Sequence, residues 1–295
     1  MKTRLPLLIA VLTLVGGDLA AAQPAAIPGA PSQLRIGLFA PNSRFTGGSS
    51  FSYINGVARH IQNVTGIPTT GKVWRSAGAF RAAARTLDFA VVDPVFLCRR
   101  RYPVLASGRL GGGSRAAWAL FARGGISNLA QLKGKRLAMA ASGAGDVSFA
   151  EGMLGGRLKL SGFVKFVFRN DLTAAINAVK GGAADAVLAP VVMARGLRRV
   201  FSSPSVPNAG FVVIKRGLPR ALINKVSSAV RGYGASGVGG WGGAASYSCP
   251  SGRVRYGVTL VNLRYVPPAR GNMIRKLKPG KGYQLAPLIT LFQAR

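Results

Sequence analysis

Apolar runs alternate with amphipathic stretches from residue 34 onwards. Residues 51–65, for example, have Ile54, Val57, Ala58 and Ile61 at the spacing that places them on one face of a helix. The first half of the pattern predicts strand, helix, strand, helix and strand over residues 34–39, 51–65, 72–74, 77–85 and 87–92. This β-α-β-α-β order favours a parallel sheet with helices on its two faces.

The pattern then starts again in the second part of the chain. It predicts strands over 116–122, 136–141, 163–168 and 184–188, a short helix over 129–132, and helices that begin near Val147 and Leu172. A strand over 211–214 and a helix over 218–230 follow, then a glycine-rich stretch over 232–243 and a strand over 253–265. Two successive α/β units in one chain predict two similar lobes.

The N-terminal residues have the pattern of an export signal. A basic start is followed by an apolar run over residues 5–15 and by an Ala-x-Ala site that ends at Ala22. We therefore expect residues 1–22 to be a signal peptide and residues 23–33, which are rich in Pro and Ala, to be a linker. No cysteine follows the apolar run, which argues against a lipid anchor. The expected location is the periplasm or the outside of the cell.

The charge is strongly unbalanced, with 40 Lys and Arg against 7 Asp and Glu and a net charge of +33. The basic residues are spread along the whole chain, with short clusters at 99–101, 195–199 and 275–278, so the imbalance comes mainly from missing acids. Proteins that bind nucleic acid usually gather Lys and Arg on one face instead. We interpret the loss of acids as adaptation to an acidic extracytoplasmic environment. The alternative explanation of the charge is an anionic partner, either a polymer such as nucleic acid or a membrane surface.

The chain has two cysteines, Cys98 and Cys249. In an exported protein they could form one disulfide. Two separate buried thiols are the alternative, and the sequence leaves both open.

Four phrases of the sequence stand in an order that is typical of one family. They are LDFAVVDP at 87–94, LKGKRLAMAAS at 132–142, AINAVKGGAADA at 175–186 and SSPSVPNAGFVV at 202–213. On the basis of these phrases, the chain from Leu34 to about Val230 resembles the type II periplasmic substrate-binding proteins. Within this group it resembles the phosphate/phosphite/phosphonate-binding family.

The resemblance implies an α/β, two-lobed periplasmic binding protein type II fold with a ligand cleft between the lobes. Lobe 1 would cover 34–123 and 207–295, including the glycine-rich C-terminal tail, and lobe 2 would cover 124–206. Strands near 116–122 and 211–214 would cross between the lobes.

The resemblance also implies where a ligand would bind. In this architecture the ligand lies at the carboxyl ends of strands, where helix N-termini and backbone amides favour an anion. The expected contacts are Ser142, Gly143, Ala144 and Gly145 from lobe 2, and Asn42, Ser43, Ser76 and Asp93 from lobe 1. Each of them could equally be an ordinary turn or N-cap residue. Glycines replace the usual hydroxyls, and nearby acids would repel an anion, so phosphate-type specificity stays open.

Four of the few acids, Asp88, Asp93, Asp146 and Asp185, lie in or beside the four phrases. In a chain with so few carboxylates, this placement suggests a structural or ligand role. For Asp88 and Asp185 we favour the simpler interpretation that they precede strands as turn residues.

The expected function is that of an extracytoplasmic solute-binding protein, which captures a small, anionic, phosphate- or phosphonate-like ligand for an ABC-type importer. We expect a monomer that is not an enzyme and uses no cofactor or metal. Catalysis by a Ser/His pair or a metal cluster would need His60, the only histidine, which lies in a predicted helix beside basic residues. The Gly143-x-Gly145 turn lacks the third glycine of a dinucleotide-binding fingerprint.

The alternative function is a binding-protein fold used as a basic adhesive module for DNA, lipopolysaccharide or an acidic partner protein.

Overall fold

The computed structural model describes residues 26–43, 48–97, 100, 102–109, 113–143, 145–155, 158–234 and 240–244. All of them belong to one compact unit, Met1–Val261. The predicted signal peptide, the predicted strand over 253–265 and both cysteines, Cys98 and Cys249, lie outside the described residues. None of the described helices is long and apolar enough to cross a membrane.

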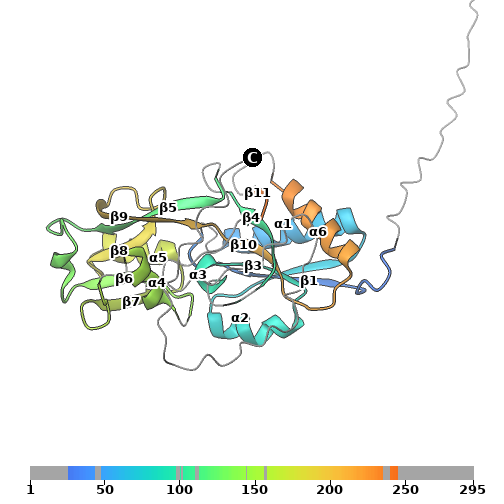
Figure 1. The fold of residues 1–295 in the computed structure, drawn as a ribbon, viewed down its shortest axis with the longest axis horizontal. Coiled ribbons are helices and arrows are strands. Elements are labelled where there is room, and N and C mark those ends of the chain that lie inside the picture. Colours follow the sequence, from blue (N-terminus) through green and yellow to red (C-terminus); the bar gives the residue numbers. More distant parts are fainter. Residues whose placement is uncertain are drawn as a thin grey trace, which may run out of the picture. The chain divides into compact units, whose positions relative to one another are not determined.

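The first sheet has six strands in the order β11-β4-β10-β3-β1-β2. They are β1 (Leu34–Phe39), β2 (Thr69–Val73), β3 (Phe89–Val92), β4 (Val104–Gly108), β10 (Gly210–Val213) and β11 (Trp241–Gly242). Strand β1 pairs in parallel with β2 and β3, whereas β10 is antiparallel to β3 and β4. Helices α1 (Gly48–Thr65) and α6 (Arg220–Gly232) lie on one face and α2 (Ala77–Ala83) on the other (Figure 1).

The helix face that periodicity predicts in α1 forms part of the core of this sheet. Ile54 and Ile61 are fully buried in one cluster with strand residues such as Leu34. On the opposite face, Phe39 of β1 stacks on Phe80 of α2 with ring centroids 5.3 Å apart. Each such side chain contributes about 1.5–3 kcal/mol by leaving water, so the two faces together fix the helices on the sheet.

The second sheet has five strands in the order β7-β6-β8-β5-β9. They are β5 (Arg115–Ala122), β6 (Arg136–Ala140), β7 (Lys165–Arg169), β8 (Ala186–Pro190) and β9 (Arg198–Pro207). Helix α4 (Asp146–Met153) packs on one face through Phe149 and Met153, and α5 (Leu172–Lys180) on the other through Leu172 and Ile176. The short helical turns are α3 (Pro94–Leu97), η1 (Ala84–Thr86) and η2 (Ala130–Leu132).

The two sheets share one plan. Each contains three parallel neighbours, β2-β1-β3 and β7-β6-β8, and the third of these has an antiparallel strand beside it, β10 or β5. The prediction of a two-lobed α/β fold is confirmed.

The connections between the sheets differ from the prediction. Strand β5 pairs with β9 from Arg115 to Ala122 and with β8 from Trp118 to Ala122, and β10 pairs only within the first sheet. The expectation that strands near 116–122 and 211–214 cross between the lobes is therefore wrong. The chain passes between the sheets after the end of β4 at Gly108 and again through Asn208 and Ala209, between β9 and β10. The predicted lobe boundaries stay predictions.

The side chain of Asn208 bonds to the backbone at both connections between the sheets. Its Nδ2 donates to the carbonyl oxygens of Gly108 and Gly113, both at 2.9 Å. One side chain thus fixes both crossing points of the backbone.

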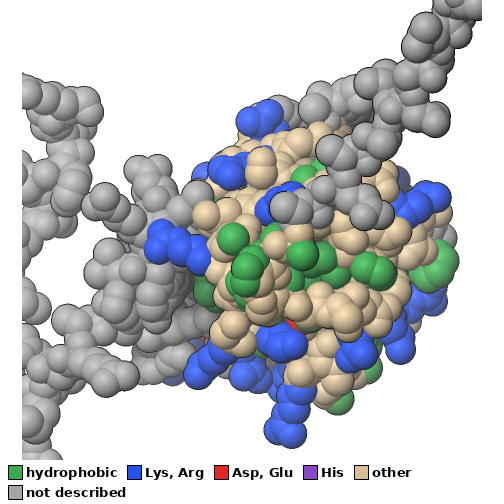
Figure 2. Space-filling view, turned by 90° about the vertical axis from the view of Figure 1, so that its right-hand side faces the viewer, with side chains coloured by type: hydrophobic (Ala, Val, Ile, Leu, Met, Phe, Trp, Pro, Cys, Tyr) green, Lys and Arg blue, Asp and Glu red, His purple; other side chains and the backbone are tan. Residues whose placement is uncertain are grey.

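Basic side chains are spread widely over the surface that Figure 2 displays, the side at the right of Figure 1. Lys and Arg surround this face, apolar and other side chains lie between them, and almost no Asp or Glu is visible. On this side the positive charge comes with a general shortage of acids and is not gathered into one groove.

Candidate functional site

The loops that follow β1 and β6 meet each other. Both strands lie in the parallel part of their sheet, so both loops leave the carboxyl edge, where ligands bind in open α/β sheets. Asn42 Nδ2 donates to Ser142 Oγ at 2.6 Å, and the Leu172 amide donates to the Pro41 carbonyl at 2.9 Å. We call this region the lobe junction and define it by Asn42, Asp93, Ser142, Gly143 and Asp146.

Asp93 is the acid of the first lobe at the junction, and it has no exposed surface. It follows β3, and its carboxylate accepts from the amides of Asn42 and Val95, both at 2.8 Å, and from Asn42 Nδ2 at 3.3 Å. Burial raises the pKa of Asp93 to about 6, because desolvation outweighs the hydrogen bonds that favour the charged form. Asp93 therefore holds the loop after β1 in place.

Asp146 is the acid of the second lobe at the junction. It is the first residue of α4, and Oδ2 accepts from the amides of Ser142 and Gly143, both at 3.0 Å. The positive end of the helix dipole favours a carboxylate there. The sequence predicted these same amides as donors to a ligand anion, so an internal carboxylate takes the place expected for the ligand.

Two glycines shape the loop after β6. Gly143 has φ +111° and Gly145 has φ +145°, a region that residues with a side chain rarely adopt. A Cβ on Gly143 would lie 2.9 Å from the Cβ of Ala77 in α2, which belongs to the first lobe. Glycine at 143 is thus required by the backbone and by the close approach of the lobes.

Four of the eight predicted contact residues come together at the junction: Asn42, Asp93, Ser142 and Gly143. Three of these are buried, with exposed fractions of 9% for Asn42, 0% for Asp93 and 3% for Ser142. Their polar atoms bond to one another, to Asp146 and to the Val95 amide, so the junction is internally satisfied in this structure.

The other four predicted residues have separate positions. Ser43 Oγ donates to the Ala40 carbonyl at 2.7 Å. Ser76 is exposed and is the N-cap of α2, where its Oγ accepts from the Ala79 amide at 3.2 Å. Gly145 is the N-cap of α4, and Ala144 lies outside the described residues.

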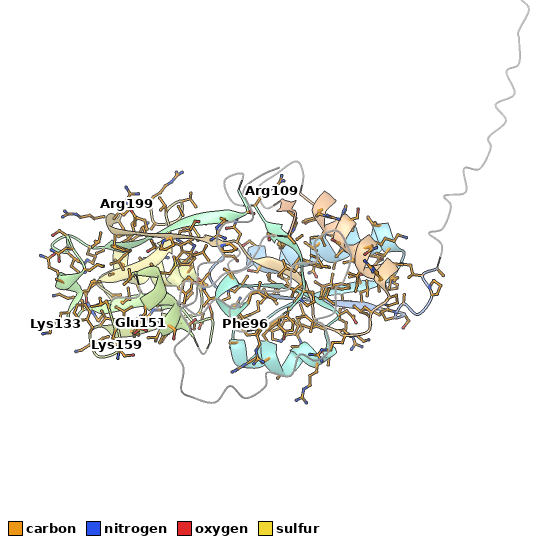
Figure 3. All side chains as sticks on the ribbon, in the orientation of Figure 1. Phe96, Arg109, Lys133, Glu151, Lys159 and Arg199 are labelled. Carbon is orange, nitrogen blue, oxygen red and sulfur yellow. The ribbon has the colours of Figure 1, made fainter. Side chains whose placement is uncertain are left out.

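The sequence suggested a structural or ligand role for Asp146 and also a repulsion of anions, but it did not predict that Asp146 bonds to the amides of its own loop. The signal was present: an acid in the first turn of a helix that follows a glycine-containing loop. Phe96 of α3, labelled in Figure 3, is a residue that the sequence did not single out. It packs edge-on against Phe39 and Phe80, with ring centroids 5.4 Å apart in both pairs.

Asp88 and Asp185 have equivalent roles away from the junction. The Asp88 carboxylate accepts from the Arg35 amide in β1 at 2.9 Å, and that of Asp185 accepts from the Arg136 amide in β6 at 2.8 Å. The hydrogen bond from the Arg136 side chain also lowers the pKa of Asp185. Both residues precede strands, as the favoured interpretation had it, but their carboxylates also bind amides of neighbouring strands, which is the structural role given as the alternative.

Comparison with solved structures gives similar folds. XAC2383 from Xanthomonas citri, bound to chloride ion, is 17% identical with a TM-score of 0.54, over 73% of this chain and 92% of that chain. PhnD1 from Prochlorococcus marinus, in complex with methylphosphonate, is 12% identical with a TM-score of 0.55, over 68% and 84%. A binding protein component of an ABC phosphonate transporter from Pseudomonas aeruginosa is 15% identical with a TM-score of 0.54, over 69% and 75%.

No protein-family model matches the sequence, and a search of curated proteins gave no match. At these identities the likeness to solved structures concerns the fold alone. Together with the strand order of the two sheets, it shows that the chain has the two-lobed α/β fold of the type II periplasmic binding proteins.

Proposed function

We propose that this protein is an extracytoplasmic solute-binding protein that captures a small molecule at the lobe junction for an ABC-type importer, and that it is not an enzyme. The observation that carries the proposal is the hydrogen bond from Asn42 to Ser142, which joins strand-end loops of the two lobes. Binding proteins of this type close two lobes around a ligand. One neighbour in fold is described with methylphosphonate, one with chloride and one as part of a phosphonate transporter, which supports the same kind of function here.

For the ligand we propose a small anion, with phosphate and phosphonate as first candidates. The Ser142 and Gly143 amides lie in the loop that leads into α4, and the N-terminus of a helix favours negative charge. Asp146 supports this class, since the loop already accommodates a carboxylate. A ligand anion would replace that carboxylate, which must then turn away or take up a proton.

We also propose that the protein works in an acidic compartment outside the cytoplasm. The alternative, an adhesive module for an anionic polymer, rests on the net charge of +33. The basic residues are spread along the whole chain, and on the face that Figure 2 shows they are not gathered into one groove, which favours a general loss of acids.

A thermal-shift screen tests the proposed function. The protein is heated with phosphate, methylphosphonate, chloride or small amines at about pH 7 and pH 3, on either side of the carboxylate range. We expect an oxyanion to raise the melting temperature, because a ligand that binds only the native state stabilises it. A shift with amines alone would overturn the ligand class. No shift with any small molecule, combined with salt-sensitive binding to polyanions, would overturn the function.

A further inference from the structure

A pocket of about 390 Å³ lies in the second lobe, where β5 ends and β9 begins. Its charged lining residues are Arg123, Lys180 and Arg198, and small or apolar residues form the rest. We call it the outer pocket.

The outer pocket is remote from the lobe junction. The junction loop leaves the carboxyl end of β6, and β8 runs parallel to β6. Ala122, at the pocket, pairs with Ala186 at the amino end of β8. The two sites therefore lie at opposite edges of the second sheet, separated by roughly 15 Å along a strand.

The three cations of the outer pocket have no acidic partner among the described residues. Asp185 is close, because its backbone carbonyl accepts from the Arg123 amide at 3.1 Å. Its carboxylate, however, binds Arg136, with 2.8 Å to the amide and 3.1 Å to Nη2. Neither of the two ion pairs of the described chain includes a lining residue of the pocket. Three like charges around one small depression repel one another, and a bound anion would relieve this repulsion.

Gly182 makes room for Arg123. It has φ +79°, and a Cβ at this position would overlap the Arg123 guanidinium. The guanidinium therefore lies against the turn that follows Lys180, the last residue of α5. The carbonyl end of the helix offsets part of the repulsion between the cations. A guanidinium presents paired N–H donors that match two phosphate oxygens, and an ammonium group adds a third donor.

We propose that the outer pocket is a second anion site, which binds a phosphate monoester group through Arg123, Lys180 and Arg198. Two arginines and one lysine match the charge and the several oxygens of such a group. The volume exceeds that of phosphate alone and lies in the range of small-molecule sites. The phosphate could be free in solution or belong to a lipid headgroup.

Binding is measured on the full chain that carries Ser142→Trp, so that a ligand at the junction does not contribute. One arm titrates inorganic phosphate and glycerol 3-phosphate by calorimetry. The other arm measures sedimentation with phosphatidylcholine vesicles, with and without phosphatidic acid, whose headgroup is a phosphate monoester. Arg123→Gln and Arg198→Gln remove lining charges. Arg199→Gln is the matched control, since it removes the same charge from the next residue of β9 and does not line the pocket (Figure 3).

We expect each lining variant to weaken phosphate binding at least about tenfold, as for the loss of one charge-assisted hydrogen bond, and the control by less than about twofold. Binding in the calorimetric arm indicates a free phosphate ester, and binding only to vesicles with phosphatidic acid indicates a lipid headgroup; both support the site. An equal loss of phosphate affinity in all three variants would show that only the net charge of the protein matters, and it would overturn the proposal. So would the absence of binding in both arms. Failure of the junction to bind a ligand would leave these outcomes unchanged.

Discussion

Asn42 Nδ2 donates to Ser142 Oγ across 2.6 Å, so that one side chain connects the loop after β1 with the loop after β6. The same amide group also donates to Asp93 Oδ1 at 3.3 Å. Asn42 is therefore the residue through which the buried polar groups of the two lobes are coupled.

Replacing Asn42 with Ala should destabilise the protein. Asp93 and Ser142 are buried, and each loses a donor, so we expect the free energy of unfolding in urea to fall by about 1–3 kcal/mol. Asn63→Ala, at an exposed position of α1, is the control and should change stability by less than about 0.5 kcal/mol. Equal stability of the two variants would show that the coupling is unimportant.

Acidification should stabilise the protein through Asp93. Its pKa is about 6 in the folded state against an ordinary value of 3.8, so the folded state binds a proton that the unfolded state releases between these values. This contribution is complete below about pH 3.8 and is lost as the pH rises through 6. The lowered pKa of Asp185 acts in the opposite direction, but only below its ordinary value of 3.8.

We therefore expect stability to rise by roughly 2 kcal/mol between pH 7 and pH 4.5, measured by urea unfolding. Asp93→Asn cannot titrate and should show a flat profile over the same range. A melting temperature of the unaltered protein that collapses between about pH 6 and pH 3 would contradict this prediction and the acidic habitat with it.

The sequence predicted the apolar helix faces and most strands, but it missed β4 and β9. The apolar stripe of α1 predicted both the helix and its buried face, because a half-buried helix must repeat its apolar residues at helical spacing. Strand β9 was missed. It is an edge strand that begins with Arg198 and Arg199, contains Pro204 and is largely exposed, so it has no apolar alternation to detect.

The site was predictable only in part for a similar reason. Strand ends and glycines marked the loops of Asn42, Asp93 and Ser142 along the chain. Which atoms of these loops meet is decided by long-range packing, as in the contact between Gly143 and Ala77. That Asp146 bonds to the amides of its own loop also depends on the positive φ of Gly143 and Gly145, which a sequence pattern does not give.

Asp88 and Asp185 allow a test of equivalent positions in the two lobes. Both accept an amide of a neighbouring strand, but the Asp88 side chain is 6% exposed and that of Asp185 is 24% exposed. Asp88→Ala should therefore cost about 2–3 kcal/mol of unfolding free energy, because it leaves the part-buried Arg35 amide in β1 without its acceptor. Asp185→Ala should cost about 1 kcal/mol. The reverse order, measured by urea unfolding at pH 7, would contradict the structural roles assigned to them.

Asp146→Asn distinguishes the two classes of ligand. If the ligand is an anion, the variant removes a competing charge and should bind phosphate or methylphosphonate about tenfold more tightly. If the ligand is an amine, the variant should weaken its binding instead. Calorimetric titration at pH 7 measures both. Glu151→Gln, on the same helix but bonded to the Leu160 amide, is the matched control and should leave both affinities unchanged.

The central claim, that a small molecule binds at the lobe junction, is tested most directly by titrating Ser142→Trp with methylphosphonate and phosphate. Ser142 is 3% exposed and contacts Asn42 across the junction, so an indole ring at this position would fill the space between the two loops. Ser202→Trp, at an exposed position of β9, is the control. We predict that Ser142→Trp weakens binding at least about 100-fold while circular dichroism shows a folded protein, and that Ser202→Trp binds as the unaltered chain does. A folded Ser142→Trp variant with unchanged affinity would contradict the account.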